Sequence, residues 1–325
     1  MTQPRRHTAL ALALLPLAAA CVPDRDENES LVTVPRIIAI QMEPAEVAPR
    51  QAFTLRALYA GGAQSDLDWA FCTVQKPLSE LGPIARSCLA PDGAGLAEPF
   101  ATGLEASTSM PADACRLYGP DRPSPKVGEP AGRPVDADPS GGYYQPIGLF
   151  DYDQSEAGLF EARVACSLPG VTRAQFTEWT MRYVRNRNPE IDGFEALSGG
   201  EVLALDGGGA ALHVSPGEKL ELRVWTPLCG SEVAEDAACG GAEPYLYFDL
   251  TARELVTRTE TLNASWFANA GRFSDSRTRV ESAEEGGLGA SVWTAPRDPG
   301  PVDVWVVVRD NRGGVVWRSA VIEVD

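Results

Sequence analysis

The chain has 325 residues, with 28 Lys and Arg against 45 Asp and Glu, so its formal net charge is −17 at pH 7. A negative charge of this size disfavours nucleic acid and anionic lipid surfaces as partners, because like charges repel. The length suffices for two domains of roughly 100 to 200 residues each.

The chain opens with a short apolar segment that ends at Cys21. Arg5 and Arg6 precede an apolar run over residues 9–20. A membrane-spanning helix needs about 20 apolar residues, and this run is shorter. A positive start, a short apolar stretch and small residues before a cut site are typical of an export signal. We therefore expect residues 1–20 to be a signal peptide.

Cys21 follows three alanines, and in this the segment resembles a bacterial lipobox. The resemblance implies that the Cys21 thiol is alkylated by diacylglycerol before cleavage and that the freed amine is then acylated. The membrane is then a partner through the acylated Cys21. Many Gram-negative lipoproteins carry Asp after this cysteine for inner-membrane retention, so Val22 favours the outer membrane. The alternative is an ordinary signal peptide cut nearby, with Cys21 left as a spare thiol.

Acidic residues come next, and then the pattern changes. Residues 21–33 are rich in carboxylates and predict a solvated tether. Apolar residues then alternate with others over residues 38–42, 53–59 and 67–72, which is the period of β-strands. We expect a first β domain over residues 34–170.

Residues 89–142 are rich in proline, which removes ladder donors and fixes φ. They predict an insertion with little regular structure, and long loops of this kind are either functional or disordered. Strand character returns at residues 143–147 and 159–166.

One helix is predicted, within a linker over residues 171–190. Thr172 and Gln175 have the spacing of a capping box, and apolar side chains recur at helical spacing as far as Val184. Asn188 precedes a proline and should end the helix. Three arginines near this end suit the helix dipole, which we favour over an anion site: Arg182, Arg185 and Arg187.

Residues 191–325 return to the strand pattern as a second β domain with about eight predicted strands. Residues 47–56 align with residues 214–223 at a constant offset of 167, so the same unit is used twice. Each copy leads, after an insertion, to a tryptophan strand with Trp69 or Trp266. A buried tryptophan at this place is typical of an immunoglobulin-like domain. The prediction is an all-β protein of two immunoglobulin-like β-sandwich domains with one short helix between them.

The turns and core positions also resemble those of immunoglobulin-like domains in envelope lipoproteins of myxobacteria and related Gram-negative bacteria. The residues that carry this resemblance are 44–49, 214–217, 265–273, 293–296 and 304–314. Such proteins are mostly without an assigned activity, so the resemblance implies no catalytic residues.

Six further cysteines remain, an even number that suits disulfides in an oxidising compartment. Six cysteines allow 15 pairings. Proximity favours Cys72 with Cys88 and Cys229 with Cys239, which leaves Cys115 with Cys166. The rival is a metal site, but no C-x-x-C occurs and His213 is the one histidine after the signal, so the usual zinc spacings are absent. We expect neither a metal nor a cofactor.

Catalytic patterns are not found. His213 lies in a predicted strand and no G-x-S-x-G occurs, which favours a structural histidine. Asp151, Asp153 and Ser155 resemble the start of a calcium loop, but Glu156 stands where that loop requires glycine.

The function predicted is a non-catalytic binding or scaffolding module of the cell envelope, with an envelope protein or glycan as partner. One alternative is an envelope glycan hydrolase, which would need two carboxylates at a suitable distance, whereas pairs such as Glu284 and Glu285 are usually surface groups. The other is a polysaccharide-binding module with a sugar-stacking face, although strand positions favour the core for its candidates: Trp225, Trp293, Trp305 and Trp317.

Overall fold

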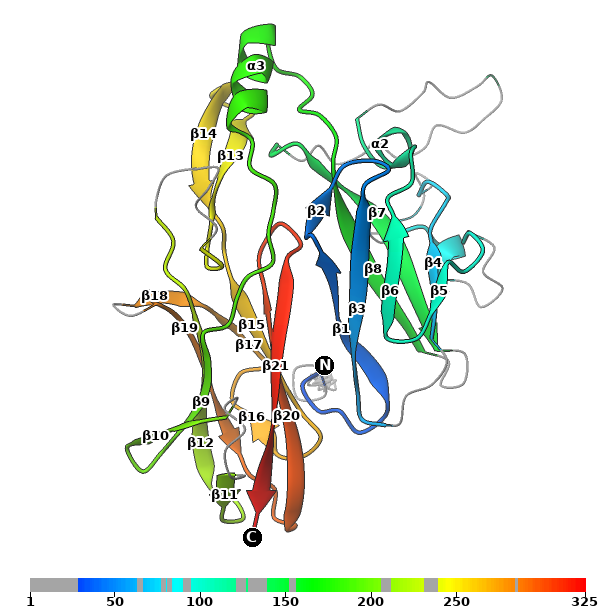
Figure 1. The fold of residues 1–325 in the computed structure, drawn as a ribbon. Coiled ribbons are helices and arrows are strands. Elements are labelled where there is room, and N and C mark those ends of the chain that lie inside the picture. Colours follow the sequence, from blue (N-terminus) through cyan, green and yellow to red (C-terminus); the bar gives the residue numbers. More distant parts are fainter. Residues whose placement is uncertain are drawn as a thin grey trace, which may run out of the picture.

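The computed structural model describes residues 29–62, 67–76, 80, 84–89, 95–120, 127, 139–151, 156–205, 212–230, 239–283 and 286–325. The predicted signal peptide (residues 1–20), Cys21 and the first part of the predicted tether lie outside the described residues, as do Asp153, Ser155, Glu284 and Glu285. The protein is all-β, and two immunoglobulin-like sandwiches lie side by side (Figure 1). This confirms the predicted fold class.

Domain 1 is the sandwich that comes first in the chain. One sheet has the order β1 (Arg36–Glu43), β3 (Ala52–Ala60) and β6 (Glu105–Ser109), all antiparallel. The facing sheet has the order β2 (Glu46–Val47), β8 (Glu156–Ala165), β7 (Gly142–Asp151), β4 (Leu67–Phe71) and β5 (Ala101–Thr102).

Domain 2 repeats this plan with more strands. Its first sheet has the order β10 (Glu201–Ala204), β9 (Gly193–Ser198), β12 (Lys219–Thr226), β19 (Gly286–Thr294) and β16 (Arg272–Phe273), and β18 (Glu281–Ala283) also pairs with β19. Its second sheet has the order β11 (Leu212–Val214), β21 (Val315–Val324), β20 (Gly300–Arg309), β15 (Asn263–Ala268) and β17 (Arg277–Arg279).

The internal repeat is preserved down to single hydrogen bonds. In both copies a short strand pairs parallel with the last strand of its own domain, Val47 opposite Val164 and Val214 opposite Val324. A turn follows in which the side chain of Gln51 accepts from the Ala48 N–H at 3.1 Å. In the second copy, Glu218 accepts from the Ser215 N–H at 2.9 Å. The alignment offset of 167 is therefore a structural equivalence.

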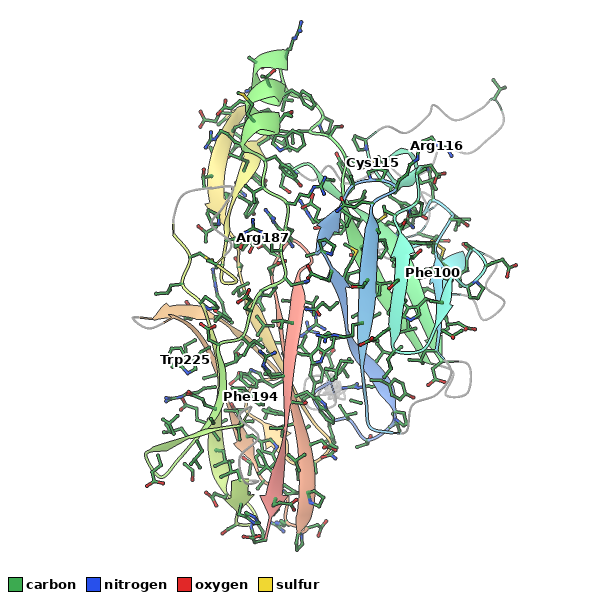
Figure 2. The ribbon with its side chains drawn as sticks, in the orientation of Figure 1. Phe100, Cys115, Arg116, Arg187, Phe194 and Trp225 are labelled. Carbon is green, nitrogen blue, oxygen red and sulfur yellow. A yellow bond between two sulfur atoms is a disulfide. The ribbon has the colours of Figure 1, made fainter. Side chains whose placement is uncertain are left out.

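A tryptophan fills the centre of each sandwich. Trp69 on β4 and Trp266 on β15 are fully buried, and both strands hold the same place in their sheets. Figure 2 shows the side chains, including Phe194, which belongs to the buried core of domain 2. Alternating burial along β12 and β3 follows the alternation in the sequence, so the core is the face that periodicity predicts.

Helix α3 (Arg173–Arg182) lies between the two domains in the chain and packs on the hairpin of β13 (Pro244–Asp249) and β14 (Glu254–Thr259) (Figure 1). The predicted capping box of Thr172 and Gln175 is confirmed. The predicted end is wrong, because the helix stops at Arg182 and the chain runs extended from Tyr183 onward. Arg185 and Arg187 therefore lie beyond the helix, and the dipole explanation does not apply to them.

The proline-rich region differs from its prediction. The prediction of little regular structure over residues 89–142 is wrong in part, because β5 and β6 lie inside this range, together with α2 (Ala114–Leu117). A 3-10 turn, η1 (Arg86–Cys88), precedes them. Strand β6 contributes one small buried side chain, Ala106, so its apolar signal is weak and backbone pairing with β3 decides its place. Most of the proline cluster itself lies outside the described residues.

The end of the predicted tether is docked rather than solvated. Val32 is 2% exposed and packs with Ile38 and Trp305. The Val32 N–H donates to the Ala268 carbonyl at 2.8 Å, and the Ala268 N–H donates to the Ser30 carbonyl at 2.9 Å. Residues 30–32 thus extend the edge of domain 2 before the chain enters domain 1.

The six paired cysteines follow the pairing that proximity favoured. Disulfides join Cys72 to Cys88, Cys115 to Cys166, and Cys229 to Cys239. The second disulfide ties α2 to the end of β8 across domain 1.

Gly217 in the repeated turn gives a test of backbone strain. Its φ is 76°, and a Cβ there would meet nothing within 4 Å. We expect Gly217→Ala to lower the free energy of unfolding by about 1 kcal/mol, because a Cβ disfavours positive φ. Urea unfolding measures this loss.

The control is Gly230→Ala, where the added Cβ also meets nothing and φ is not positive. The equivalent residue of domain 1 is Arg50, with a φ of 68°. Replacing Arg50 with Gly should cost less than Gly217→Ala or should stabilise. A loss from Gly230→Ala as large as that from Gly217→Ala would contradict the strain argument.

Candidate functional site

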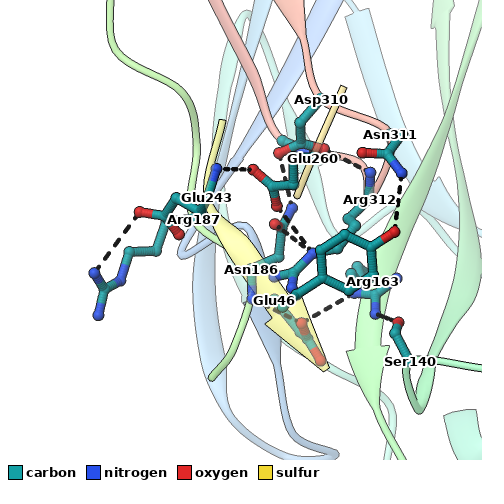
Figure 3. Close-up of polar contacts among 12 residues, drawn as sticks. Glu46, Ser140, Arg163, Asn186, Arg187, Glu243, Glu260, Asp310, Asn311 and Arg312 are labelled. Carbon is teal, nitrogen blue, oxygen red and sulfur yellow. Dashed lines mark hydrogen bonds and ion pairs between the residues drawn. The ribbon is translucent and has the colours of Figure 1, made fainter. Parts of the chain in front are cut away.

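A buried polar network lies at the junction of the two domains and the linker (Figure 3). At its base, the Arg163 guanidinium on β8 contacts the Glu46 carboxylate on β2 at 2.9 Å, and both side chains are almost completely buried. Arg163 also donates to the Tyr144 hydroxyl at 2.9 Å and to the Ser140 hydroxyl at 2.6 Å. Each of the three guanidinium nitrogens thus has an acceptor within domain 1.

The linker is held by the same carboxylate. The Tyr183 hydroxyl donates to one oxygen of Glu46, and the Asn186 N–H donates to the other at 2.8 Å. Burial first, and then the Glu46 charge, raises the pKa of Tyr183, so its hydroxyl remains a donor. Tyr183 is the first residue after α3, and its backbone is extended where its side chain reaches Glu46.

Asn186 then connects the linker to domain 2. Its side-chain amide donates to the Asp310 carboxylate at 3.1 Å, and its carbonyl oxygen accepts from Arg312 Nε at 2.9 Å. Both partners lie in the turn between β20 and β21. One asparagine thus binds domain 1 through its backbone and domain 2 through its side chain.

Glu260 completes the network on the side of domain 2. Its carboxylate lies 3.0 Å from Arg312 Nε and accepts from the Glu243 N–H at 3.1 Å. Burial first, and then the like charge of Asp310, raises the pKa of Glu260 to about 8. Arg187, labelled in Figures 2 and 3, reaches Glu243 at 3.8 Å from the linker.

Below the network, β1 of domain 1 and β21 of domain 2 make direct contacts, and we call this contact the seam. Gln41 on β1 donates to the Val315 carbonyl on β21 at 2.5 Å. Asn188 donates to the Met42 carbonyl at 2.7 Å and accepts from the Val315 N–H at 2.9 Å, so it bridges the two strands. The Arg56 guanidinium lies over the Trp317 ring at 4.8 Å. These bonds fix the orientation of one domain against the other.

A groove of about 470 Å³ opens beside this seam. Its walls come from β1, the linker and β21, and carboxylates and guanidiniums both line it, among them Glu43, Glu190 and Arg318. The Glu43 carboxylate accepts from Asn188 at 2.8 Å, and Arg318 donates to the Ile191 carbonyl. The groove offers mixed polar contacts to a ligand or partner.

The tryptophans considered for a sugar-stacking face do not form one. Trp293 and Trp305 are buried, and Trp317 lies partly buried under Arg56 in the seam. Trp225 is partly buried and donates to Glu195 at 2.9 Å.

The remaining candidate residues have structural contacts. His213 is exposed on β11 and contacts the Asp325 carboxylate at 2.9 Å, which raises the pKa of His213. Asp151 is buried and accepts from the Tyr59 hydroxyl at 2.6 Å.

The described residues contain no group of three or more His, Cys, Asp or Glu that could hold a metal ion. No helix in this part of the chain is long and apolar enough to cross a membrane.

Sequence reasoning missed the network. Glu46 and Arg163 are directly opposite each other in a parallel pair, but the two strands are separated by more than a hundred residues. A single polar residue beside apolar neighbours, such as Arg163 between Ala162 and Val164, was the one local signal.

Comparisons with known proteins give no family. No protein-family model matches the chain, and no curated protein matches it. Among solved structures, dimeric latent PorU from Porphyromonas gingivalis is similar at 14% identity and a TM-score of 0.21, over 91% of this chain and 24% of that one. Three N-terminal domains of the outer capsid protein Hoc of bacteriophage RB49 are similar at 11% identity and a TM-score of 0.19, over 90% and 59% of the two chains.

The C-terminal domain of the AgI/II polypeptide BspA from Streptococcus agalactiae is similar at 9% identity and a TM-score of 0.22, over 89% of this chain and 99% of that domain. The chain spans less than two thirds of the length of PorU and of the Hoc fragment. Since these TM-scores are low, the fold assignment depends on the strand topology described above.

The buried pair gives a prediction on stability. Glu46→Gln removes the counter-charge of Arg163 and should lower the free energy of unfolding by about 3 to 5 kcal/mol, because a buried cation then lacks compensation. The control is Glu178→Gln, which breaks an exposed pair with Arg182 and should cost at most about 1 kcal/mol. Urea unfolding compares the two variants, and equal losses would contradict the assignment.

Glu260 gives a prediction on pH. Since its folded pKa of about 8 exceeds the ordinary value of 4.5, the folded chain keeps a proton that the unfolded chain has lost between these values. The contribution of Glu260 to stability is therefore complete below about pH 4.5 and is lost as the pH rises to about 8.

Glu260→Gln has a neutral side chain at every pH, so its free energy of unfolding should not show the Glu260-dependent decline between about pH 4.5 and 8. The altered contact with Arg312 adds a difference in the free energy of unfolding that is the same at every pH. Urea unfolding at about pH 4, 6 and 8.5 measures the difference between parent and variant. Glu254→Gln, exposed on β14, is the control. A difference that stays the same at all three pH values would contradict the prediction.

Proposed function

We propose that the chain is a lipid-anchored cell-envelope protein that acts as a non-catalytic binding or scaffolding module. The observation that carries the proposal is the buried network through which Glu46, Asn186 and Asp310 hold two sandwiches and their linker in one arrangement. A fixed pair of domains presents surfaces at a constant spacing, which suits a scaffold better than a hinge.

The three disulfides support an extracytoplasmic location, because thiols persist as disulfides in oxidising compartments. The lipobox-like segment before Cys21 supports export and anchoring, and Val22 supports the outer membrane of a Gram-negative bacterium. The partner we propose is an envelope protein. A glycan partner is the weaker candidate, since the four tryptophans considered for stacking are buried or engaged in contacts.

The anchor is tested by Cys21→Ser in a Gram-negative host. The parent should incorporate labelled palmitate and pellet with outer membranes, whereas the variant should lose the label, because the acylated thiol is gone. Separation of inner and outer membranes on a density gradient gives the location. A labelled Cys21→Ser protein, or an unlabelled parent, would contradict the anchor.

The partner is tested by cross-linking intact cells of the native host and identifying bound proteins by mass spectrometry. A discrete partner should be recovered with the parent and also with a surface control such as Glu178→Gln. It should be lost with Glu46→Gln if the fixed arrangement of the domains matters for binding. Recovery of envelope glycan alone would contradict the scaffold and favour the glycan-binding or hydrolase alternatives.

A further inference from the structure

A second, smaller pocket lies where the N-terminal segment meets both domains. Its volume is about 220 Å³, and residues 29–30, the start of β1, β15 and the start of β17 line it. The charged side chains in its lining are Glu29, Arg36 and Arg277, and three serines add hydroxyls: Ser30, Ser265 and Ser276. Apart from Glu29, these side chains are hydrogen-bond donors.

The arginines of this pocket have spare capacity to donate. Arg36 donates to the Glu29 backbone carbonyl at 2.5 Å, while its Nε is buried and has no hydrogen-bond partner among the described residues. Arg277 stands at the rim, 73% exposed, with its guanidinium 3.4 Å from the Glu29 carboxylate. A carboxylate of the chain itself therefore already lies against the rim arginine.

Arg309 adds a third positive charge behind the wall. It donates to the Ile38 carbonyl at 2.9 Å and to the Ser265 hydroxyl oxygen at 3.5 Å. Since Ser265 accepts there, its own O–H is left to donate. No carboxylate in the described part of the chain forms an ion pair with Arg309.

The net charge around this pocket is positive, opposite in sign to the net charge of the whole chain. Two guanidiniums line the pocket and that of Arg309 contacts its wall, against the one lining carboxylate of Glu29, in a protein whose net charge is −17. Burial first, and then the charge of Arg277, lowers the pKa of Arg309 to about 10, as expected where positive charge is in excess. An anion in the pocket would relieve this excess.

We propose that this pocket binds a phosphate group, with Arg36 and Arg277 as its charged donors and Ser265 and Ser276 as its neutral ones. Guanidinium groups donate in forked pairs that match the oxygens of phosphate, and a tetrahedral anion can accept from several directions at once. Glu29 competes for Arg277, so an incoming phosphate displaces its carboxylate.

Two sources offer this chemistry, a free phosphate compound and a phospholipid headgroup. Glu29 lies eight positions after Cys21, a stretch that spans at most about 29 Å. A headgroup of the anchoring membrane is therefore within reach of the pocket. This second source depends on the proposed anchor, and the first does not.

The experiment uses the full chain in a nonionic detergent. Calorimetric titration with inorganic phosphate at about 0.1 M salt, where charges beyond about 10 Å are screened, measures the first source. The second arm compares mixed micelles that contain dioctanoyl phosphatidylglycerol with micelles that contain dioctanoylglycerol, which lacks phosphate.

Arg277→Gln should weaken binding by about tenfold or more, because it removes a charged donor without touching the core. Glu29→Gln should strengthen binding, since it removes the competing carboxylate. The matched control is Arg279→Gln, which makes the same charge change two positions along β17 at an exposed side chain outside the pocket. It should leave binding unchanged within about twofold.

If inorganic phosphate binds and the binding depends on Arg277, the ligand is a free phosphate compound. If only phosphatidylglycerol binds, or if it binds more tightly than inorganic phosphate, and the binding depends on Arg277, the ligand is the headgroup. The absence of binding in both arms would overturn the proposal. So would an Arg279→Gln variant as weak as Arg277→Gln. The titration with inorganic phosphate does not require an acylated Cys21. The pocket proposal can therefore hold or fail independently of the proposed lipid anchor.

Discussion

The contact between Glu46 and Arg163 is the constraint on which the arrangement of the whole molecule depends. A buried carboxylate and a buried guanidinium are costly unless every donor and acceptor is satisfied. Domain 1 supplies partners for Arg163, but the oxygens of Glu46 need donors from the linker, Tyr183 and Asn186. Because Asn186 also binds Asp310, satisfying one carboxylate places the linker and the second domain.

The two domains share a plan and differ in what is added to it. Both use the same turn, with proline as its second residue, and the same parallel pairing with their last strand. Domain 2 adds the β13 and β14 hairpin, and domain 1 adds the chain between α2 and β7. These additions meet each other, since the Phe248 N–H donates to the Pro139 carbonyl at 2.8 Å and Trp179 of α3 donates to the Ser140 carbonyl. The two sandwiches thus follow one plan, and the additions join them beside the network.

The negative net charge of the chain does not predict the sign of the charge at each site on its surface. An excess of carboxylates disfavours anionic partners for the surface as a whole. The pocket around Arg36 and Arg277 has the opposite sign, and screening confines each field to about 10 Å at ordinary salt. A binding site can therefore have a charge that the composition of the chain does not suggest.

The sequence by itself determined the features that depend on neighbours in the chain. Alternating side chains indicated the strands, Thr172 and Gln175 capped the helix, and proximity favoured the disulfide pairing that the structure has. Only the tertiary structure decided where α3 ends, that Ala106 lies in a sandwich strand, and which carboxylates meet which arginines. Each of these depends on a partner distant in sequence, and local propensity contains no information about which distant group will be adjacent in the fold.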